Sequence, residues 1–134
     1  GRKFVDFTTL NRAKVDLAAW ANAQVQRNGL GRRWSLWFQD YPVLLSPTWT
    51  QPPFVFNFDI EDEASALATV ELMRPVLPAN LLGLPAVVVP GGMADSLPVG
   101  VQVMGARYTD LRCLSIAEQI ESACGLDTPI DPIN

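Results

Sequence analysis

The sequence predicts an α/β fold in which a few buried strands are covered by helices on both faces. Three short apolar runs support this prediction, at residues 43–47, 86–90 and 99–105. Each run is rich in Val or Leu and ends at Pro or Gly, as is typical of strands buried on both faces. Segments with helical periodicity precede the first run, separate it from the second and follow the third. This order of elements is that of a layered α/β design.

Four helices are expected around these strands. Apolar residues at helical spacing predict each helix, and a Gly or Pro closes each one. Carboxylates crowd the start of the third helix, where the helix dipole favours negative charge. In chain order the helices are predicted over residues 8–27, 34–39, 59–73 and 110–124. They are ended by Gly29, by Pro42, by Pro75 together with Pro78, and by Gly125.

The remaining segments are predicted as loops, a turn and a tail. Residues 48–58 hold prolines and aromatics and are expected to form an ordered loop on an apolar surface, because Trp49, Phe54 and Phe56 are costly to leave in water. Residues 91–98 carry turn chemistry. The last residues, 127–134, are expected to form a tail.

Length, charge and cysteines limit the class of protein. With 134 residues, 49% of them hydrophobic, the chain suits one domain over residues 1–134. Its net charge of −4 and scattered Lys and Arg give no reason to expect nucleic-acid binding. No apolar stretch approaches the roughly 18 residues of a membrane span. Cys113 and Cys124 fall on one predicted helix, about 16 Å apart along its axis, so we expect buried free thiols and a cytoplasmic location.

Catalytic and metal-binding residues are not predicted within the chain. It has no histidine, the commonest general base and metal ligand. None of its serines lies in a Gly-x-Ser-x-Gly elbow, and neither Lys3 nor Lys14 has a serine close in sequence. The carboxylates at residues 59–63 are interpreted as a solvated helix start rather than a cation site. We therefore expect no metal or cofactor.

Three segments carry a resemblance to a known family. Residues 40–48, DYPVLLSPT, resemble the DxLLxPT segment of the amidase signature family. Residues 78–92, PANLLGLPAVVVPGG, resemble its N-x-x-G-x-P-A-x-x-V-P-x-G segment. Residues 97–105, LPVGVQVMG, resemble its G-L-P-V-G-V-Q-x-x-G strand, with Ser96 where glycine is usual. Each segment alone is a weak match, but the three in this order are specific.

The resemblance implies a fold and a chemistry. The fold would be part of the family's α/β/α sandwich, with about three or four mixed strands and helices on the faces. The chemistry would be hydrolysis of a carboxamide by a serine nucleophile, a second serine in a cis peptide and a lysine. All three lie upstream of the matched region in the family, so no catalytic residue is assigned here and Lys14 is not given that role. The chain is thus interpreted as a C-terminal fragment of an amidase, inactive in isolation.

The resemblance also implies one wall of a substrate pocket, because the family's segment before the Asn lines the cleft. An equally weighted alternative is that Asn80 only braces a turn and Gly83 only allows close packing. Relatives that take glutamine tend to have an acidic residue seven positions before the Asn, where this chain has Met73. A thioether cannot pair with a cation, so an apolar or neutral amide is expected. The predicted substrate-binding residues are Met73, Val76, Leu77, Ala79 and Asn80.

Alternatives remain open for function and partners. Arg74 could meet a substrate carboxylate or form a surface ion pair. The parent could instead be an amidotransferase A-type subunit, or the chain a non-catalytic binding module. As partners we expect a small-molecule amide in the complete enzyme, no nucleic acid and no membrane. We also expect self-association, or packing against a missing N-terminal part, through apolar surface and an open sheet edge.

Overall fold

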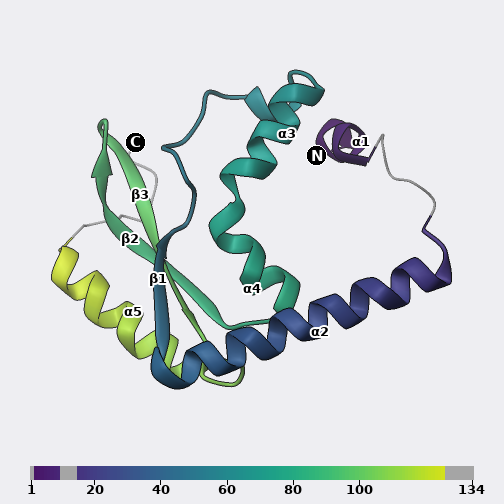
Figure 1. Cartoon of the computed structure of the whole chain (residues 1–134). Helices are drawn as coiled ribbons and strands as arrows, with labels where there is room; N and C mark the ends of the chain where they lie inside the picture. Colours follow the sequence, from purple (N-terminus) through teal and green to yellow (C-terminus); the bar gives the residue numbers. More distant parts are fainter. Residues whose placement is uncertain (1, 10–14, 126–134) are drawn as a thin grey trace.

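The computed structural model describes residues 2–9 and 15–125 and confirms the α/β fold class (Figure 1). Lys14 and the predicted tail at residues 127–134 lie outside the described residues. No helix in the described part is long and apolar enough to cross a membrane. The elements are α1 (Arg2–Thr9), α2 (Leu17–Asp40), β1 (Val43–Pro47), η1 (Phe58–Ile60), α3 (Glu63–Leu72), η2 (Arg74–Val76), α4 (Leu77–Leu82), β2 (Ala86–Ala94), β3 (Leu97–Gly105) and α5 (Asp110–Cys124).

The three predicted strands form one sheet in the order β1-β3-β2. Both pairings are antiparallel, whereas mixed strands were expected. A tight hairpin makes the β2–β3 pairing antiparallel: the two strands extend into the predicted turn at residues 91–98 and are joined by Asp95 and Ser96. Both residues have positive φ, 50° and 65°, which a two-residue hairpin turn requires. A register shift between Pro90 and Gly92 breaks the ladder on the β2 side.

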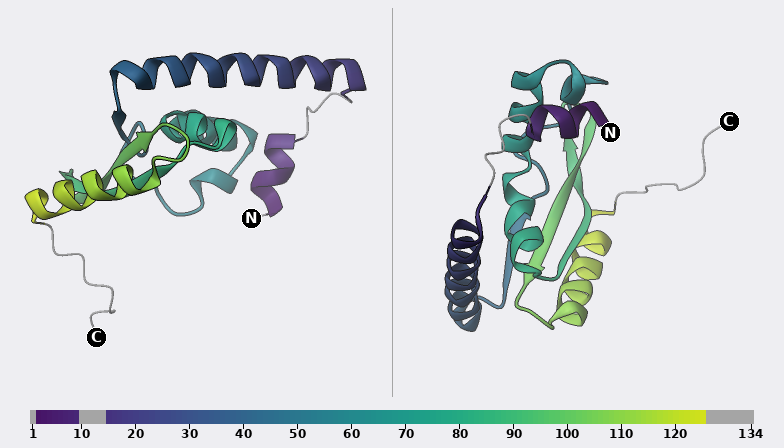
Figure 2. Two further views of the ribbon diagram at one scale, coloured as in Figure 1. Left: turned by 90° about the horizontal axis from the view of Figure 1, so that it is seen from below. Right: turned by 90° about the vertical axis from the view of Figure 1, so that its right-hand side faces the viewer.

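Each face of the sheet is covered by helix, as the apolar strands predict. Val103 and Met104 are neighbours on β3, point to opposite faces and are both 0% exposed. Val103 packs with Cys113 of α5, whereas Met104 packs with Phe38 at the end of α2. Figure 2 shows the sheet between α2 on one side and α5 on the other. The core therefore consists of two small apolar layers with the sheet between them.

The predicted helices at residues 8–27 and 34–39 are wrong in their boundaries. A single helix, α2, begins after Asp16, whose carboxylate accepts a hydrogen bond from the Ala19 amide at 2.8 Å. It runs through Gly29 without a break and ends at Asp40, just before Pro42. Two glycines cost a helix about 2 kcal/mol in total, which a helix of 24 residues can tolerate.

The third predicted helix, at residues 59–73, corresponds to two elements in the structure, η1 and α3, with Glu61 and Asp62 between them. Asp62 caps α3 by accepting the Ser65 amide at 2.8 Å, and η2 and α4 follow α3 directly. Pro75 and Pro78 do not stop helical structure, because each occupies the first turn of its helix, where no amide donor is needed. Gly83 then ends α4 with a φ of 65°. A Cβ on Gly83 would meet nothing within 4 Å, so conformation rather than close packing explains this glycine.

The loop after β1 is ordered by aromatic contacts, but its residues 50–57 are exposed, so the expectation that it lies on apolar surface is met only by the half-buried Trp49. The rings of Trp49 and Phe54 lie 5.8 Å apart, and those of Phe54 and Phe58 lie 5.4 Å apart. Phe56, however, is 93% exposed, so the prediction that it lies on apolar surface is wrong.

Candidate functional site

The five residues predicted to bind substrate lie along one short stretch, residues 73–80, where α3 passes through η2 into α4. One hydrogen bond joins this wall segment to the sheet, and a second joins the residue just before it to the loop after β1. Gln102 on β3 donates its side-chain amide to the Pro75 carbonyl at 3.1 Å. The backbone amide of Thr50 donates to the Leu72 carbonyl at 3.1 Å. The position of the wall segment is therefore set by β3 and by the loop that follows β1.

The wall segment has an inner and an outer side. Ala79 is buried against Phe38 and Met104, so its side chain belongs to the core. Leu77 and Asn80 are exposed. The half-buried members are Met73 and Val76. The structure thus separates Ala79 from the other four, which remain candidates for contact with a substrate.

Arg74 is engaged in an ion pair with Glu71, one turn earlier on the same face of the helix. Both side chains are more than half exposed, which makes this a surface pair of small energetic value. Of the two alternatives for Arg74, the surface ion pair is the one the structure contains.

A pocket of about 610 Å³ lies between the loop after β1 and the tip of the β2–β3 hairpin. We call it the aromatic pocket; no pattern in the sequence predicted it. The signal available was the run of prolines and aromatics that the loop contributes. None of its lining residues carries a charge: Pro47, Thr48, Trp49, Thr50, Gln51, Pro52, Pro53, Phe54, Ala94, Pro98, Val99, Gly100 and Val101.

The aromatic pocket and the wall segment share their supports. Thr50 lines the pocket and bonds to Leu72, the residue before Met73. Gln102, which holds Pro75, also donates to the Ser46 hydroxyl at 3.2 Å, at the end of β1 just before the pocket begins. The pocket and the wall segment are therefore linked through hydrogen bonds, although no residue of the wall segment lines the pocket.

Thr48 and Gly100, which both line the aromatic pocket, lie in close contact. The Thr48 amide donates to the Gly100 carbonyl at 3.0 Å. A Cβ on Gly100 would lie 2.7 Å from the Thr48 hydroxyl oxygen, so only glycine fits there. That hydroxyl is buried and has no hydrogen-bond partner among the described residues. Thr48, the Thr of the DxLLxPT segment, thus contacts Gly100 of the strand segment at residues 97–105.

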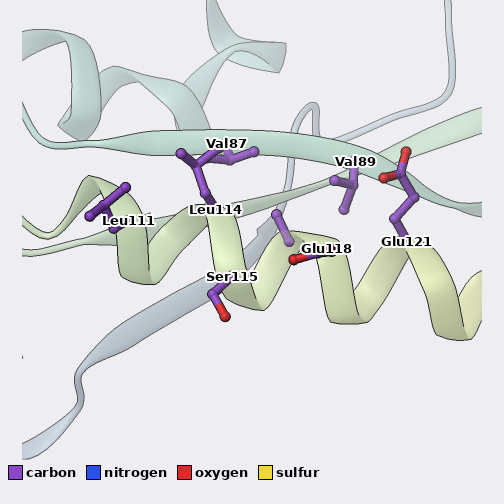
Figure 3. A pocket seen from close by; sticks show the side chains of 8 residues that line it. Val87, Val89, Leu111, Leu114, Ser115, Glu118 and Glu121 are labelled. Atoms are coloured by element: carbon purple, nitrogen blue, oxygen red, sulfur yellow. The ribbon is translucent and has the colours of Figure 1, made fainter.

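Two further pockets lie elsewhere in the described part of the molecule. A groove of about 470 Å³ runs between β2 and α5, where Val87 lies beside Leu114 and Val89 lies toward Glu121 (Figure 3). Glu118 and Glu121 of α5 also line this groove. A pocket of about 450 Å³ lies near Arg107 at the other end of the sheet. None of the five predicted residues lines any of the three pockets.

Chemical groups for hydrolysis do not come together in the part of the chain that the structure describes. The hydrogen bonds there include none between a lysine amine and a serine hydroxyl. Within the same residues no three His, Cys, Asp or Glu side chains could hold a metal ion. Asp62, from the acidic stretch at residues 59–63, acts as a helix cap, and its hydrogen bond from the Ser65 amide lowers the pKa of its carboxyl group.

Comparison with known proteins decides the family. The Amidase family model matches residues 2–114. The chain belongs to the amidase family. This confirms the resemblance seen in the three segments, two of which meet at the Thr48–Gly100 contact.

Relatives and solved structures agree with this assignment. The chain is 38% identical over 116 residues to the indoleacetamide hydrolase of Bradyrhizobium japonicum, covering 84% of this chain and 24% of that protein. It is 37% identical over 120 residues to the A-type subunit of the glutamyl-tRNA(Gln) amidotransferase of Pseudothermotoga lettingae, covering 90% and 25%. The chain therefore spans about a quarter of the length of these relatives.

The fold is also that of solved amidase-family structures. The A-type subunit of the glutamyl-tRNA(Gln) amidotransferase of Thermotoga maritima superposes with a TM-score of 0.70 at 34% identity, over 78% of this chain and 22% of that one. A 6-aminohexanoate cyclic dimer hydrolase superposes with a TM-score of 0.69 over 84% and 26%, and its 24% identity supports the fold alone.

Proposed function

We propose that this chain is part of an amide hydrolase and supplies one wall of its substrate site. The amide that it takes is neutral or apolar. The chemistry belongs to a serine nucleophile, a cis-peptide serine and a lysine elsewhere in the amidase domain, so the isolated chain is inactive. The small-molecule amide is the partner of the complete enzyme, and this chain packs against the rest of that domain. A cytoplasmic location is part of the proposal, because two free cysteines suit a reducing compartment.

The reaction proceeds through an acyl-enzyme. The serine oxygen attacks the amide carbon and the C–N bond breaks. The amine leaves with a proton, and water then releases the acid. Backbone N–H groups stabilise the oxyanion that forms on the way. The wall segment contributes by orienting the amide, because correct placement of the reacting carbon lowers the barrier to attack.

Met73 is the observation that carries the substrate class. It closes α3 at the start of the wall segment and is half-buried. Its thioether has no charge to pair with a substrate ammonium, and its neighbour Arg74 is already paired with Glu71. An uncharged amide therefore suits this wall better than glutamine, whose ammonium group needs a carboxylate partner.

The relatives support hydrolysis of this kind without deciding the substrate. One is named an indoleacetamide hydrolase, and indoleacetamide is an uncharged aromatic amide. Others are named as parts of an amidotransferase, and Met73 argues against that alternative. An ammonia-transfer assay with a tRNA partner separates the two. The experiment below distinguishes part of an amide hydrolase from a non-catalytic binding module.

The experiment is a chimera in which residues 2–125 replace the aligned quarter of the Bradyrhizobium japonicum relative. The rest of that relative would supply the proposed nucleophile and lysine. We expect the chimera to hydrolyse acetamides that carry an aryl group on the acetyl carbon, as indoleacetamide does. The chain alone should show no turnover. Met73→Asp in the chimera should raise KM for a neutral amide about tenfold or more, because it places a charge against an apolar group. Met73→Leu, of similar volume and no charge, is the matched control and should change KM little.

Two results would contradict the proposal. One is a folded chimera that is inactive on every neutral amide tested, which would favour the binding module. The other is turnover by the chain alone that disappears when one of its own serines is mutated.

A further inference from the structure

We infer that the aromatic pocket binds a neutral, planar aryl group of the amide substrate. This inference rests on the proposed function and names the class of substrate more narrowly. It places the ring between the loop after β1 and the hairpin tip, and the carboxamide in front of the wall segment.

The composition of the pocket favours a ring. Trp49 and Phe54 stand edge to face at 5.8 Å with 60° between their planes. This arrangement presents both a ring face and a ring edge, the two surfaces with which aromatic groups pack best. Phe54 is still 37% exposed, so an aryl group that covers it removes apolar surface from water. A volume of about 610 Å³ lies within the usual size of small-molecule sites.

The lining also excludes charged ligands. Its polar side chains are those of two threonines and one glutamine, with no Asp, Glu, Lys or Arg among them. A carboxylate or ammonium group placed there would lose its hydration without gaining an ionic partner. The aromatic pocket therefore discriminates between an unsubstituted ring and an ionised one.

The pocket is preformed rather than assembled on binding. Thr48 and Thr50 fix the loop through backbone hydrogen bonds to Gly100 and Leu72. Pro52 and Pro53 restrict the loop backbone further, since each proline fixes its own φ. A site that is already ordered loses little conformational entropy when a ligand enters it.

The link to the wall segment gives the ligand its orientation. Thr50 contributes to the pocket lining and, through its bond to Leu72, holds the residue next to Met73. A molecule with its ring beside Trp49 and its amide beside Met73 would span this contact. The neutral wall and the uncharged pocket thus select for the same substrate, an uncharged aryl amide.

The test measures binding to the 134-residue chain without turnover. Phenylacetamide and acetamide are titrated into ¹⁵N-labelled chain while the Trp49 indole N–H signal is followed by NMR, with Trp49→Phe assigning that signal. Phenylacetamide should shift the signal saturably, and acetamide should leave it in place. Phe54→Ala should weaken phenylacetamide binding about tenfold, because it removes one ring of the pair. Leu114→Ala, in the groove between β2 and α5, is the matched truncation and should not change the affinity.

A second variant guards against loss of folding. Ala94→Leu fills the pocket from the hairpin and should also weaken binding, while the indole signals of Trp34 and Trp37 report that the core is intact. Equal shifts with acetamide, no saturation with phenylacetamide, or unchanged affinity in Phe54→Ala would each overturn the inference. None of these results would affect the amide hydrolysis proposed above, because no bond is broken in this assay. A chimera without activity would in turn leave ring binding unaffected.

Discussion

Gln102, in the middle strand of the sheet, donates its side-chain amide to the backbone carbonyl of Pro75 at 3.1 Å. The glutamine is 2% exposed, so this bond lies in the interior and joins the sheet to the wall segment. Removing a buried partner leaves the other group unsatisfied. We predict that Gln102→Leu lowers the free energy of unfolding by about 1–3 kcal/mol, measured by urea denaturation.

A matched control for Gln102 lies on α5. The side chain of Gln119 donates to the Ser115 carbonyl at 3.2 Å, but at an exposed position. Gln119→Leu makes the same chemical change where water can replace the lost bond, so its effect should stay within about 0.5 kcal/mol. Equal losses in the two variants would show that burial of Gln102 is not what makes its bond important.

How much the sequence could predict depends on the range of the contacts involved. The strand at residues 43–47 was predicted with the bounds that β1 has, because an apolar run closed by Pro47 is a local signal. The continuity of α2 through Gly29 was not predicted. A glycine is a local stop signal, but Phe38, on the next turns of α2, packs against Met104 and anchors that end of the helix.

The candidate site shows the same limit. The resemblance pointed to residues 73–80, but the inward side chain of Ala79 depends on α4, which no pattern predicted because Pro78 was interpreted as a stop. The aromatic pocket joins residues 47–54 to residues 94–101, which are 40 or more positions apart. No periodicity in one segment reveals that it faces another. Composition could only indicate that the aromatics of the loop need a surface.

Ser96 takes the place of a glycine in a hairpin turn that demands positive φ. Its φ is 65°, a conformation that costs a non-glycine residue about 1 kcal/mol. We predict that Ser96→Gly raises the midpoint of thermal unfolding, measured by circular dichroism. The control is Ser115→Gly on the exposed face of α5, which should lower the midpoint because glycine weakens a helix. A lower midpoint for Ser96→Gly would mean that the serine makes a compensating contact.

Gly105 and Gly29 should respond in opposite ways to alanine. A Cβ on Gly105 would lie 2.6 Å from the Thr109 hydroxyl oxygen and 2.7 Å from the Cys113 sulfur, in a fully packed region. Gly105→Ala should therefore destabilise the chain by about 1–3 kcal/mol. A Cβ on Gly29 meets nothing within 4 Å, so Gly29→Ala should stabilise α2 by about 0.5–1 kcal/mol. Denaturant midpoints measure both, and a change of the same sign in the two variants would refute this reasoning.

The two cysteines should differ in reactivity. Cys113 is buried, and burial raises the pKa of its thiol because the thiolate loses hydration. Cys124 is exposed. We predict that iodoacetamide labels Cys124 first and labels Cys113 slowly in the folded chain, as followed by mass spectrometry. Labelling of Cys113 as fast as that of Cys124 would show that α5 opens readily.

The raised pKa of Cys113 also gives stability a pH dependence. The unfolded chain loses this proton near pH 8.5, while the folded chain holds it to higher pH. The folded state is therefore favoured by this thiol below that pH and loses the advantage as pH rises through the pKa of the folded chain. Cys113→Ala should flatten the decline of stability above about pH 8.5. A decline that is unchanged in this variant would assign it to other groups.

Self-association of the isolated chain is the last prediction. The outer half of α2 leaves Leu17, Trp20 and Val25 each more than half exposed, and both outer strands of the sheet, β1 and β2, have an unpaired edge among the described residues. Apolar surface and open edges of this kind promote association. Sedimentation velocity should therefore show an average mass that rises with concentration.

Charge placed on α2 separates the helix from the strand edges as the cause. Trp20→Lys should shift the association to higher concentration, because it puts a hydrated ammonium into the apolar surface of α2. Tyr108→Lys makes a similar change at an exposed aromatic residue in the turn after β3 and should leave association as it is. If the Trp20→Lys variant associates like the unmodified chain, the strand edges rather than α2 form the contact between molecules. If the unmodified chain stays monomeric at high concentration, its exposed apolar surface is compatible with an independent chain. The exposed surface would then no longer support packing against the rest of an amidase domain.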